Sequence, residues 1–224
     1  TFIVPSAASM YQCGDKQQCK AAMLKAKVPT VPRSPDLVKD ADEAEKIASE
    51  IGYPVMLKSV YGGGGRGIRI VNTDQELQDA YGIVTGESIA AVGKSAILVE
   101  KFLAQTRHIE YQLARDKHGN AVHIFERECS IQRRNQKLIE QTPSPIVDQE
   151  TRDRIGKLVV NAAEAVDYTN LGTVEFLRAD NGEFYFLEIN ARLQVEHPST
   201  EFVSGLDLVK LQLDIANGEP IPFK

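Results

Sequence analysis

Residues 173–190 read TVEFLRADNGEFYFLEIN, and this stretch predicts a β-hairpin. Its centre, Asn181-Gly182, is the strongest two-residue signal for a tight hairpin turn. With that turn, Glu175 lies directly opposite Glu188, with the Cβ atoms about 5 Å apart. Two facing carboxylates repel each other unless a cation lies between them, and Mg²⁺ or Mn²⁺ prefers oxygen ligands. We therefore predict a metal site at Glu175 and Glu188.

The residues around this pair support a metal site over the alternative, two solvated glutamates on an exposed sheet. Asn190 lies two residues after Glu188, so an extended strand places it on the same face, where it can add an amide oxygen. The predicted turn also sets Asp180 opposite Glu183. It surrounds the two carboxylates with apolar neighbours, namely Leu177, Ala179, Phe184 and Phe186.

The alternation continues past the hairpin. Arg192 and Gln194 keep the spacing of two from Glu188 and Asn190, so an extended chain points all four side chains one way. Glu196 and His197 follow directly. An arginine and a further acid beside a metal pair suit an anionic substrate that must lose a proton. The alternative interpretation is a solvated strand end.

A glycine cluster, GGGGRG at residues 62–67, lies nearer the N-terminus. It matches the dinucleotide fingerprint formally, but a strand, residues 68–71, follows where that motif needs a helix. A glycine-rich hairpin can instead fold over phosphates as a lid, because its backbone N–H groups approach closely. Lys58, at the end of the preceding strand, can reach the same phosphates. The alternative is a flexible loop without a ligand.

Three further segments carry polar groups of interest. Residues 100–103 link two groups of elements and can present backbone groups to an adenine ring. His108 shares a strand face with Glu110 and Gln112, so it is either a ligand contact or a structural histidine. The basic residues Arg127, Arg133, Arg134 and Lys137 form a short cluster without interleaved aromatic residues, which argues against nucleic-acid binding.

The coarse pattern predicts an α+β protein. Capping residues predict helices after Asp15, Asp40, Thr73 and Asp148, and a last helix is expected over residues 205–216. Alternating or short apolar runs predict strands at 54–59, 68–71, 96–100, 107–115, 121–128, 172–179 and 183–190. Residues 132–145 are polar and are predicted to form a loop. Antiparallel hairpins mixed with helices indicate two lobes with antiparallel sheets and flanking helices.

Composition excludes several classes of protein. The net charge of −5 and the absence of a long basic run argue against nucleic-acid and membrane-surface binding. No apolar run approaches 18 residues, so we expect no membrane span. The three cysteines form no Cys-x-x-Cys motif, which favours reduced thiols and a cytoplasmic or mitochondrial-matrix protein. The apolar start without methionine indicates a central fragment of a longer chain.

Taken together, these residues resemble the biotin carboxylase family of ATP-grasp enzymes. The resemblance covers nearly the whole chain. It is most specific in KSVYGGGGRG at 58–67, EKFL at 100–103, RHIE at 107–110, ERECSIQRRNQK at 126–137 and EINARLQVEHP at 188–198. Tyr61 departs from the family, whose lid usually has another glycine there, and Asn135 stands where many members have histidine.

The resemblance implies ATP-dependent activation of bicarbonate to carboxyphosphate, followed by carboxylation of biotin on a carrier protein. It implies ATP contacts at Lys16, Lys58, Gly64, Gly65, Glu100, Lys101, Leu103, His108, Gln132 and Asn135. It places Mg²⁺ or Mn²⁺ at Glu175, Glu188 and Asn190. Bicarbonate and biotin would meet Lys137, Arg192, Gln194, the backbone of Val195 and Glu196, of which Glu196 is the base, Arg192 stabilises the biotin enolate and Lys137 is the third catalytic residue.

The resemblance also implies an organisation and partners. Residues 1–28 would be a connector helix from a preceding domain, 29–103 the small lobe with the glycine lid, and 104–224 the larger lobe, incomplete at its C-terminus. A biotin carboxyl carrier and a carboxyltransferase are the implied partners, and a homodimer is compatible with the family. Two alternatives stay open: an ATP- and metal-binding fragment without catalysis, and another carboxyphosphate-forming ligase such as a carbamoyl phosphate synthetase.

Overall fold

A computed structural model describes residues 2–60, 67–133 and 136–223. The chain divides into two compact units, which are described separately below. The smaller unit is Val31–Ala104, and the larger unit combines Thr1–Thr30 with Gln105–Lys224. In the described part of the chain, no helix is long and apolar enough to cross a membrane.

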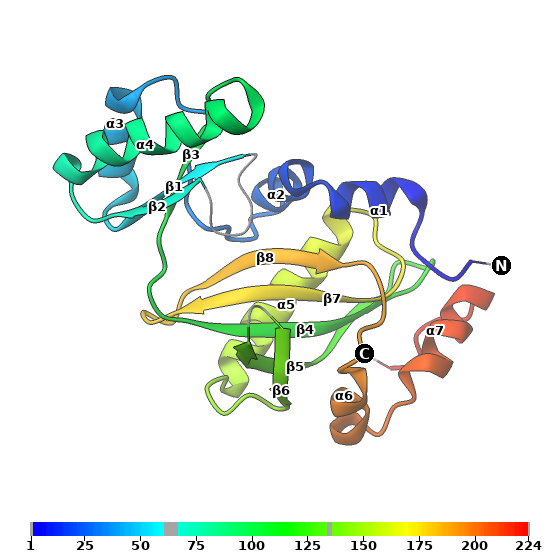
Figure 1. Ribbon diagram of the computed structural model, residues 1–224. Helices are drawn as coiled ribbons and strands as arrows, with labels where there is room; N and C mark the ends of the chain where they lie inside the picture. Colours follow the sequence, from blue (N-terminus) through cyan, green and yellow to red (C-terminus); the bar gives the residue numbers. More distant parts are fainter. Residues whose placement is uncertain (1, 61–66, 134–135, 224) are drawn as a thin grey trace. The chain divides into compact units, whose positions relative to one another are not determined.

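The smaller unit packs two helices on a three-stranded antiparallel sheet of order β2-β1-β3 (Figure 1). Its elements are α3 (Ala41–Ile51), β1 (Val55–Ser59), β2 (Ile68–Val71), α4 (Asp74–Val92) and β3 (Ile97–Lys101). Leu57 and Val99 on the sheet and Leu77 on α4 are fully buried in its core. This unit therefore has a hydrophobic core of its own.

Reciprocal caps begin both helices of the smaller unit, as the sequence predicts. Asp40 accepts a hydrogen bond from the backbone N–H of Glu43 at 2.9 Å, and Glu43 accepts one from the N–H of Lys39 at 2.8 Å. Thr73 caps α4 through the N–H of Glu76 at 3.3 Å. These bonds satisfy N–H groups that the first helical turn leaves without partners.

The larger unit is built on a five-stranded antiparallel sheet of order β6-β5-β4-β7-β8. The strands are β4 (Thr106–Arg115), β5 (Ala121–Arg133), β6 (Gln136–Gln141), β7 (Asn170–Ala179) and β8 (Phe184–Asn190). The helices are α1 (Ala7–Gly14), α2 (Lys16–Lys25), α5 (Gln149–Ala165), α6 (His197–Ser204) and α7 (Leu208–Asn217). Asp15 and Asp148 cap α2 and α5 as predicted.

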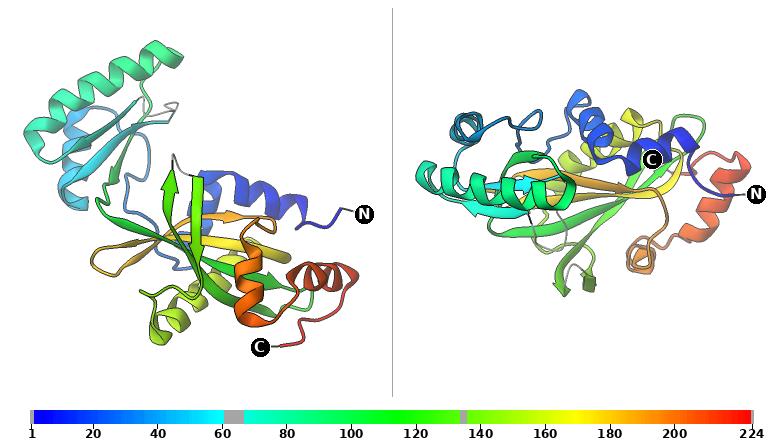
Figure 2. Two further views of the ribbon diagram at one scale, coloured as in Figure 1. Left: turned by 60° about the horizontal axis from the view of Figure 1, so that its bottom comes forward. Right: turned by 45° about the horizontal axis from the view of Figure 1, so that its top comes forward.

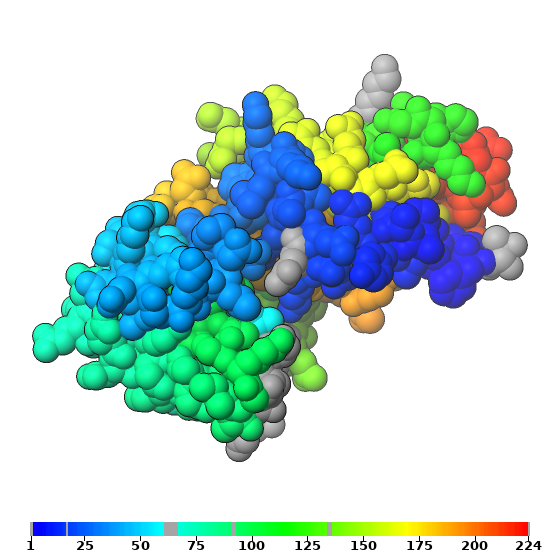
Figure 3. All heavy atoms as spheres, turned by 90° about the horizontal axis from the view of Figure 1, so that it is seen from above, coloured from blue at the N-terminus to red at the C-terminus, as the bar shows by residue number. Residues whose placement is uncertain are grey.

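Helices α2 and α5 cover one face of this sheet and bury its aromatic side chains. Phe176, Phe184 and Phe186 pack edge to face there, beside Met23 of α2 and Val159 of α5. Figure 3 shows α1 and α2, in dark blue, on the surface of the larger unit. Since the apolar side chains fill this face, the opposite face of β4 and β7 is left for polar groups.

The structure corrects the predicted loop at residues 132–145. Instead, β5 continues to Arg133, and β6 pairs with it in antiparallel fashion, as the green strands in the left view of Figure 2 show. Strand β6 forms an edge of the sheet and is largely exposed, with Leu138 and Ile139 more than half exposed. An edge strand that buries neither face carries no apolar alternation, so the pattern did not reveal it.

The hairpin of β7 and β8 differs from its predicted register near the turn. Ala179 accepts a hydrogen bond from the N–H of Gly182, whose φ is 84°, so three residues form the loop and Asp180 does not pair with Glu183. One extra residue, Leu187, then makes a bulge in β8. Beyond the bulge, Glu175 does lie opposite Glu188, as predicted.

The bulge also corrects the predicted surroundings of the two carboxylates. Phe186 pairs with Phe176 and faces the helices, although it precedes Glu188 by two residues. A regular strand would place Phe186 and Glu188 on one face, but the extra residue reverses the alternation. Phe184 and Phe186 therefore belong to the core and not to the face of Glu175.

A second bulge shapes the hairpin of β4 and β5. Phe125 has a φ of 53°, and the register shifts by one residue between the pairs Leu113–His123 and Tyr111–Glu126. After this shift, Arg127 lies directly opposite Glu110. The bulge thus brings the guanidinium of β5 to the polar face of the sheet.

The last helix, predicted over 205–216, corresponds to α7, which begins three residues later, whereas α6, which precedes it, was not predicted. Gly205, with a φ of 71°, ends α6, and Asp207 caps α7 by accepting from the N–H of Lys210 at 2.7 Å. Pro198 in the first turn of α6 is the signal that marks this helix, because proline fits the first helical positions.

Candidate active site

Most of the predicted site residues of the larger unit surround one cavity of about 490 Å³. It is lined by His108, Gln132, Lys137, Glu175, Glu188, Asn190, Arg192, Gln194, Val195 and Glu196, together with Gln136 and Glu140. These residues come from β4, β5, β6, β7, β8 and the segment that leads into α6. Strand β8 ends at Asn190, yet Arg192 and Gln194 still line the same cavity as predicted.

The ammonium group of Lys137 bonds to three carboxylates. It donates to Glu110, to Glu175 at 3.0 Å and to Glu196 at 2.7 Å. Burial lowers the pKa of Lys137, but the charges of Glu110, Glu196 and Glu175 outweigh it and raise the pKa above its ordinary value. Lys137 is therefore a fixed positive charge at the floor of the site.

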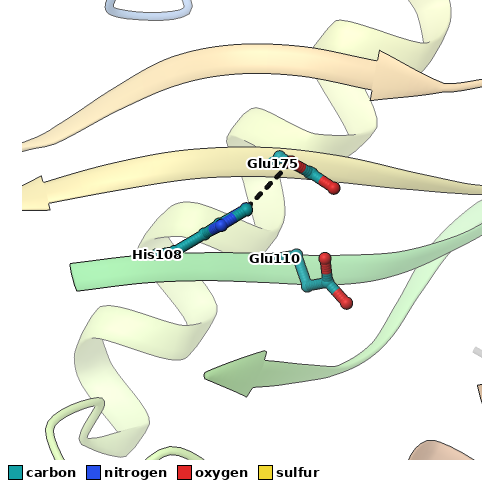
Figure 4. A group of neighbouring side chains, drawn as sticks. All are labelled: His108, Glu110 and Glu175. Carbon is teal, nitrogen blue, oxygen red and sulfur yellow. Dashed lines mark hydrogen bonds and ion pairs between the residues drawn. The ribbon is translucent and has the colours of Figure 1, made fainter. Parts of the chain in front are cut away.

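Glu175 is the most heavily bonded carboxylate of the site. His108 on β4 bonds to it at 2.8 Å (Figure 4), and Asn190 and Gln194 donate to it at 2.9 and 3.2 Å. Burial raises its pKa, but the hydrogen bond from His108 and the ammonium group of Lys137 hold that pKa at about 2. Glu175 therefore stays ionised although it is buried.

His108 is held in one orientation by its second ring nitrogen. Gln132 approaches Nδ1 of His108 with its amide nitrogen at 2.7 Å and bonds to the carbonyl of Cys129 at the same distance. Because an amide nitrogen donates, Nδ1 accepts and Nε2 carries the proton that faces Glu175. The side chains of His108, Glu110 and Gln112 all bond to residues on the polar face of the sheet, as the alternation of β4 predicts.

The opposed pair of glutamates carries an amide between its carboxylates. The side-chain nitrogen of Asn190 lies 2.9 Å from Glu175 and 3.3 Å from Glu188. The same amide can turn its oxygen toward a cation, so two carboxylates and one amide form a hard-oxygen donor set. The residues present therefore fit a Mg²⁺ or Mn²⁺ ion.

A second group of possible ligands has a different character. His108, Glu110 and Glu175 offer ligand atoms within 4.8 Å of one another (Figure 4). Lys137 already bonds to both glutamates. An ammonium group thus supplies the compensating charge, so this group is an ion-pair cluster.

Arg192 and Val195 lie at the rim of the cavity. Arg192 is exposed, and its guanidinium makes a long hydrogen bond of 3.4 Å to the carbonyl of Leu193. Val195 is 90 % exposed. Glu196 lies deeper. Burial raises its pKa, but the hydrogen bond and charge of Lys137 outweigh burial and lower it, so Glu196 is held as a carboxylate.

The other predicted nucleotide contacts lie elsewhere in the chain. In the smaller unit, Lys58 pairs with Glu100 at 2.9 Å. Lys101 donates to the carbonyls of Gly52 and Tyr53 at 2.8 and 2.9 Å, and Leu103 follows β3 half-buried. In the larger unit, Lys16 begins α2 and is exposed. Tyr61, Gly64, Gly65 and Asn135 lie outside the described residues.

Arg127 is the main residue of the site that the sequence reasoning misjudged. It was considered only as part of a short basic cluster, but it is fully buried and bonds to five side chains. The signal that could have indicated its burial is its position on β5, where it pairs with Glu110 on β4. The bulge at Phe125, which completes that register, has no clear sequence signature.

Comparison with known proteins identifies the family of the chain. Residues 15–224 match the family model described as carbamoyl-phosphate synthase L chain, ATP binding domain. The chain belongs to this family. Within it, the predicted kinship with biotin carboxylases and the α+β ATP-grasp fold are confirmed by the relatives that follow.

Two relatives and one solved structure illustrate the similarity. The chain is 48% identical over 218 residues to biotin carboxylase of Nostoc sp., covering 97% of this chain and 49% of the relative. It is 50% identical over 224 residues to the mitochondrial propionyl-CoA carboxylase alpha chain of Mus musculus, covering 100% of this chain and 31% of the relative. The chain thus spans about half the length, or less, of these curated relatives.

The solved structure is the biotin carboxylase domain dimer of the 2-oxoglutarate carboxylase of Hydrogenobacter thermophilus. It matches with a TM-score of 0.81 and 48% identity, covering 100% of this chain and 49% of that chain. That protein is described in complex with MgADP, ADP and bicarbonate. Its ligands are of the classes that the resemblance implies for this ATP-grasp chain.

Proposed function

We propose that this ATP-grasp domain is the part of a biotin carboxylase that binds ATP, a divalent metal ion and bicarbonate. The protein would convert bicarbonate to carboxyphosphate at the expense of ATP and then carboxylate biotin on a carrier protein. The observation that carries the proposal is Lys137, a partly buried ammonium that bonds to Glu175 and Glu196 beside the opposed pair Glu175 and Glu188.

The proposal assigns residues to the metal ion and to the nucleotide. Glu175, Glu188 and Asn190 would hold Mg²⁺ or Mn²⁺, which would offset the negative charge of the phosphates. The ATP contacts proposed from the resemblance are Lys16, Lys58, Gly64, Gly65, Glu100, Lys101, Leu103, His108, Gln132 and Asn135. His108 binds Glu175 directly, so its role in the site includes fixing a metal ligand.

Bicarbonate would bind where Lys137 and Glu196 meet. Lys137 and Arg192 supply positive charge for the anion, and Gln194 and the backbone of Val195 lie beside them. Glu196 is held as a carboxylate, the form that can accept the proton of bicarbonate. The deprotonated anion is then the nucleophile for the γ-phosphate. Arg192, which is exposed at the rim, would stabilise the biotin enolate.

The proposed function includes partners that lie outside this chain. A biotin carboxyl carrier would present biotin at the exposed rim around Arg192 and Val195, and a carboxyltransferase would use the product. The similar domain of 2-oxoglutarate carboxylase is described as a dimer, so a homodimer is part of the proposal. The final carboxyl acceptor binds elsewhere, and this site does not specify it.

The test is ATP cleavage that requires bicarbonate and rises with free biotin, measured on the complete protein. Arg192→Ala should keep ATP affinity within about tenfold and lower biotin carboxylation by at least ~100-fold, the scale of losing one transition-state donor. Glu196→Gln should spare ATP binding and slow bicarbonate-dependent cleavage by ~10²–10⁴. Glu183→Gln, an exposed change near the hairpin turn, is the control.

Three outcomes would redirect the proposal. A strong loss of ATP affinity in Arg192→Ala would contradict the assigned roles. The family model is named after carbamoyl-phosphate synthase, whose chemistry shares carboxyphosphate. Cleavage that rises with ammonia and ignores biotin would therefore favour that ligase. ATP binding without any cleavage would indicate a binding domain only.

A further inference from the structure

The guanidinium of Arg127 lies at the centre of a buried polar network beneath the cavity. Its Nε donates to Glu110 at 2.6 Å. Its Nη1 donates to Gln112 and Thr200, both at 2.9 Å, and its Nη2 to Thr173 at 3.2 Å and Gln194 at 3.0 Å. Arginine has five N–H donors, and these five bonds use them all. Arg127 therefore has no donor left for a substrate.

Two of its partners connect Arg127 to the proposed chemistry. Glu110 accepts from Arg127 through Oε1 and from Lys137 through Oε2. Gln194 accepts from Arg127 through its oxygen and donates to Glu175 through its nitrogen. Since Lys137 also donates to Glu175, Arg127, Glu110, Lys137, Glu175 and Gln194 form a closed ring of hydrogen bonds.

The ring has a direction that Arg127 imposes. A guanidinium can only donate, so the amide oxygen of Gln194 must face it and the amide nitrogen must face Glu175. The same constraint leaves one oxygen of Glu110 for Lys137. A third contact, to Thr200 on α6, holds the helix that begins directly after Glu196.

We propose that Arg127 is a positioning residue, which places Lys137 and Glu175 for bicarbonate activation through this closed ring. The inference rests on the proposed function, since that function gives Lys137 and Glu175 their roles. Arg127 also shares with Lys137 the neutralisation of the Glu110 carboxylate. Without the guanidinium, Glu110 would attract the ammonium away from Glu196 and the bicarbonate position.

The test compares Arg127→Lys with Arg152→Lys in the complete protein. Lysine keeps the charge of Arg127 but has three donors on a flexible stem, so it cannot hold five acceptors. Arg152 is a matched control, because it binds the fully buried Glu126, the neighbour of Arg127 on β5, with two bonds of 2.7 and 2.8 Å. Glu126 does not line the cavity.

We expect Arg127→Lys to lower kcat/KM for bicarbonate by about 10–100-fold, the usual loss when a group that orients a ligand is removed. Arg152→Lys should lower the Tm comparably and leave kcat/KM for bicarbonate near that of the parent. A crystal structure of Arg127→Lys should show the Lys137 Nζ displaced from Glu196. If Arg127→Lys changes only the Tm and Lys137 does not move, the inference is wrong.

A second variant decides the matter if Arg127→Lys does not fold. Glu110→Gln keeps the shape of the side chain but has only one oxygen, so it cannot accept from both Arg127 and Lys137, and kcat/KM for bicarbonate should fall severalfold. No change in that ratio would overturn the inference. These results are separate from the proposed function, which fails if the parent protein itself shows no bicarbonate-dependent ATP cleavage.

Discussion

Lys137 offsets part of the negative charge of the site. Its ammonium group bonds to Glu110, Glu175 and Glu196 at once, and the fully buried Arg127 supplies a second positive charge. An entering anion must therefore take over bonds of Lys137 that a carboxylate now holds. Glu188 has a weaker set of partners, since its one described contact is the 3.3 Å bond from Asn190.

This difference predicts the effect of Glu188→Gln. The change removes one of the two opposed charges while the buried network around Glu175 stays in place, so the fold should persist. We expect Mn²⁺-dependent nucleotide affinity to fall by at least about tenfold, or about 1.4 kcal/mol. Titration of nucleotide with Mn²⁺ measures this loss. Unchanged affinity would remove Glu188 from the metal site.

Glu175 predicts a pH dependence of stability. Its pKa in the folded protein is about 2, below its ordinary value of 4.5. Its contribution is therefore complete above pH 4.5 and is lost as the pH falls toward 2. Between about pH 4.5 and 3, this one group should cost the parent about 2 kcal/mol of unfolding free energy.

Urea unfolding at several pH values measures this contribution. Glu175→Gln should lose less stability than the parent as the pH falls from about 5 to 3, because the amide does not titrate. Glu183→Gln changes an exposed carboxylate and should keep the slope of the parent. Equal slopes for Glu175→Gln and the parent would contradict the lowered pKa.

At the residue scale, the sequence revealed side chains that follow a simple alternation. Glu175 and Glu188 were predicted to face each other from a two-residue turn, and they do so because the bulge at Leu187 offsets the extra residue of the actual loop. Asn190 lies beside them because it follows Glu188 by two residues. Arg127 was not found, because charged residues are expected to be exposed. Its burial becomes understandable only when partners from β4, β7, α6 and the preceding segment come together.

At the element scale, local chemistry determined what could be predicted. Asp15, Asp40, Thr73 and Asp148 each cap the helix that was expected to follow, because a cap involves only its own first turn. Strand β6 was missed because its identity depends on pairing with β5. Helix α6 was missed, and the helix predicted over 205–216 was begun three residues early, because Gly205 ends α6 and does not begin α7.

The cap of α3 provides a test at this scale. Asp40→Ala removes the acceptor for the N–H of Glu43 and should lower the free energy of unfolding by about 1 kcal/mol. Chemical denaturation monitored by circular dichroism checks the value. Asp42→Ala, in the exposed first turn, should cost only a few tenths of a kcal/mol. A loss of the same size in both variants would show that the cap is not responsible.

At the scale of the whole molecule, the two units have separate cores. The buried side chains of Val31–Ala104 form one cluster, and those of the larger unit form two others. The α+β class was predictable from hairpins and helices. That residues 1–30 pack with the larger unit was not, because the contact of Met23 with the core of β7 and β8 is remote in sequence.

We predict that residues 31–104 fold on their own. A chain of this size with its own core should unfold cooperatively with a free energy of roughly 3–5 kcal/mol. Circular dichroism with thermal melting checks this expectation. Leu57→Ala should abolish the transition, because truncating a fully buried leucine costs about 2–5 kcal/mol. A fragment without helical signal at low temperature would contradict the prediction.

The bulge at Leu187 has a consequence for the length of the chain. Deleting Leu187 would join Phe186 directly to Glu188 and restore regular alternation, so the phenylalanine would stay in the core and the glutamate would stay opposite Glu175. A deletion of one residue between Glu188 and Asn190 would instead turn Asn190 away from Glu175. The strand thus has one position that tolerates a change in length, and a functional variant lacking Leu187 would demonstrate it.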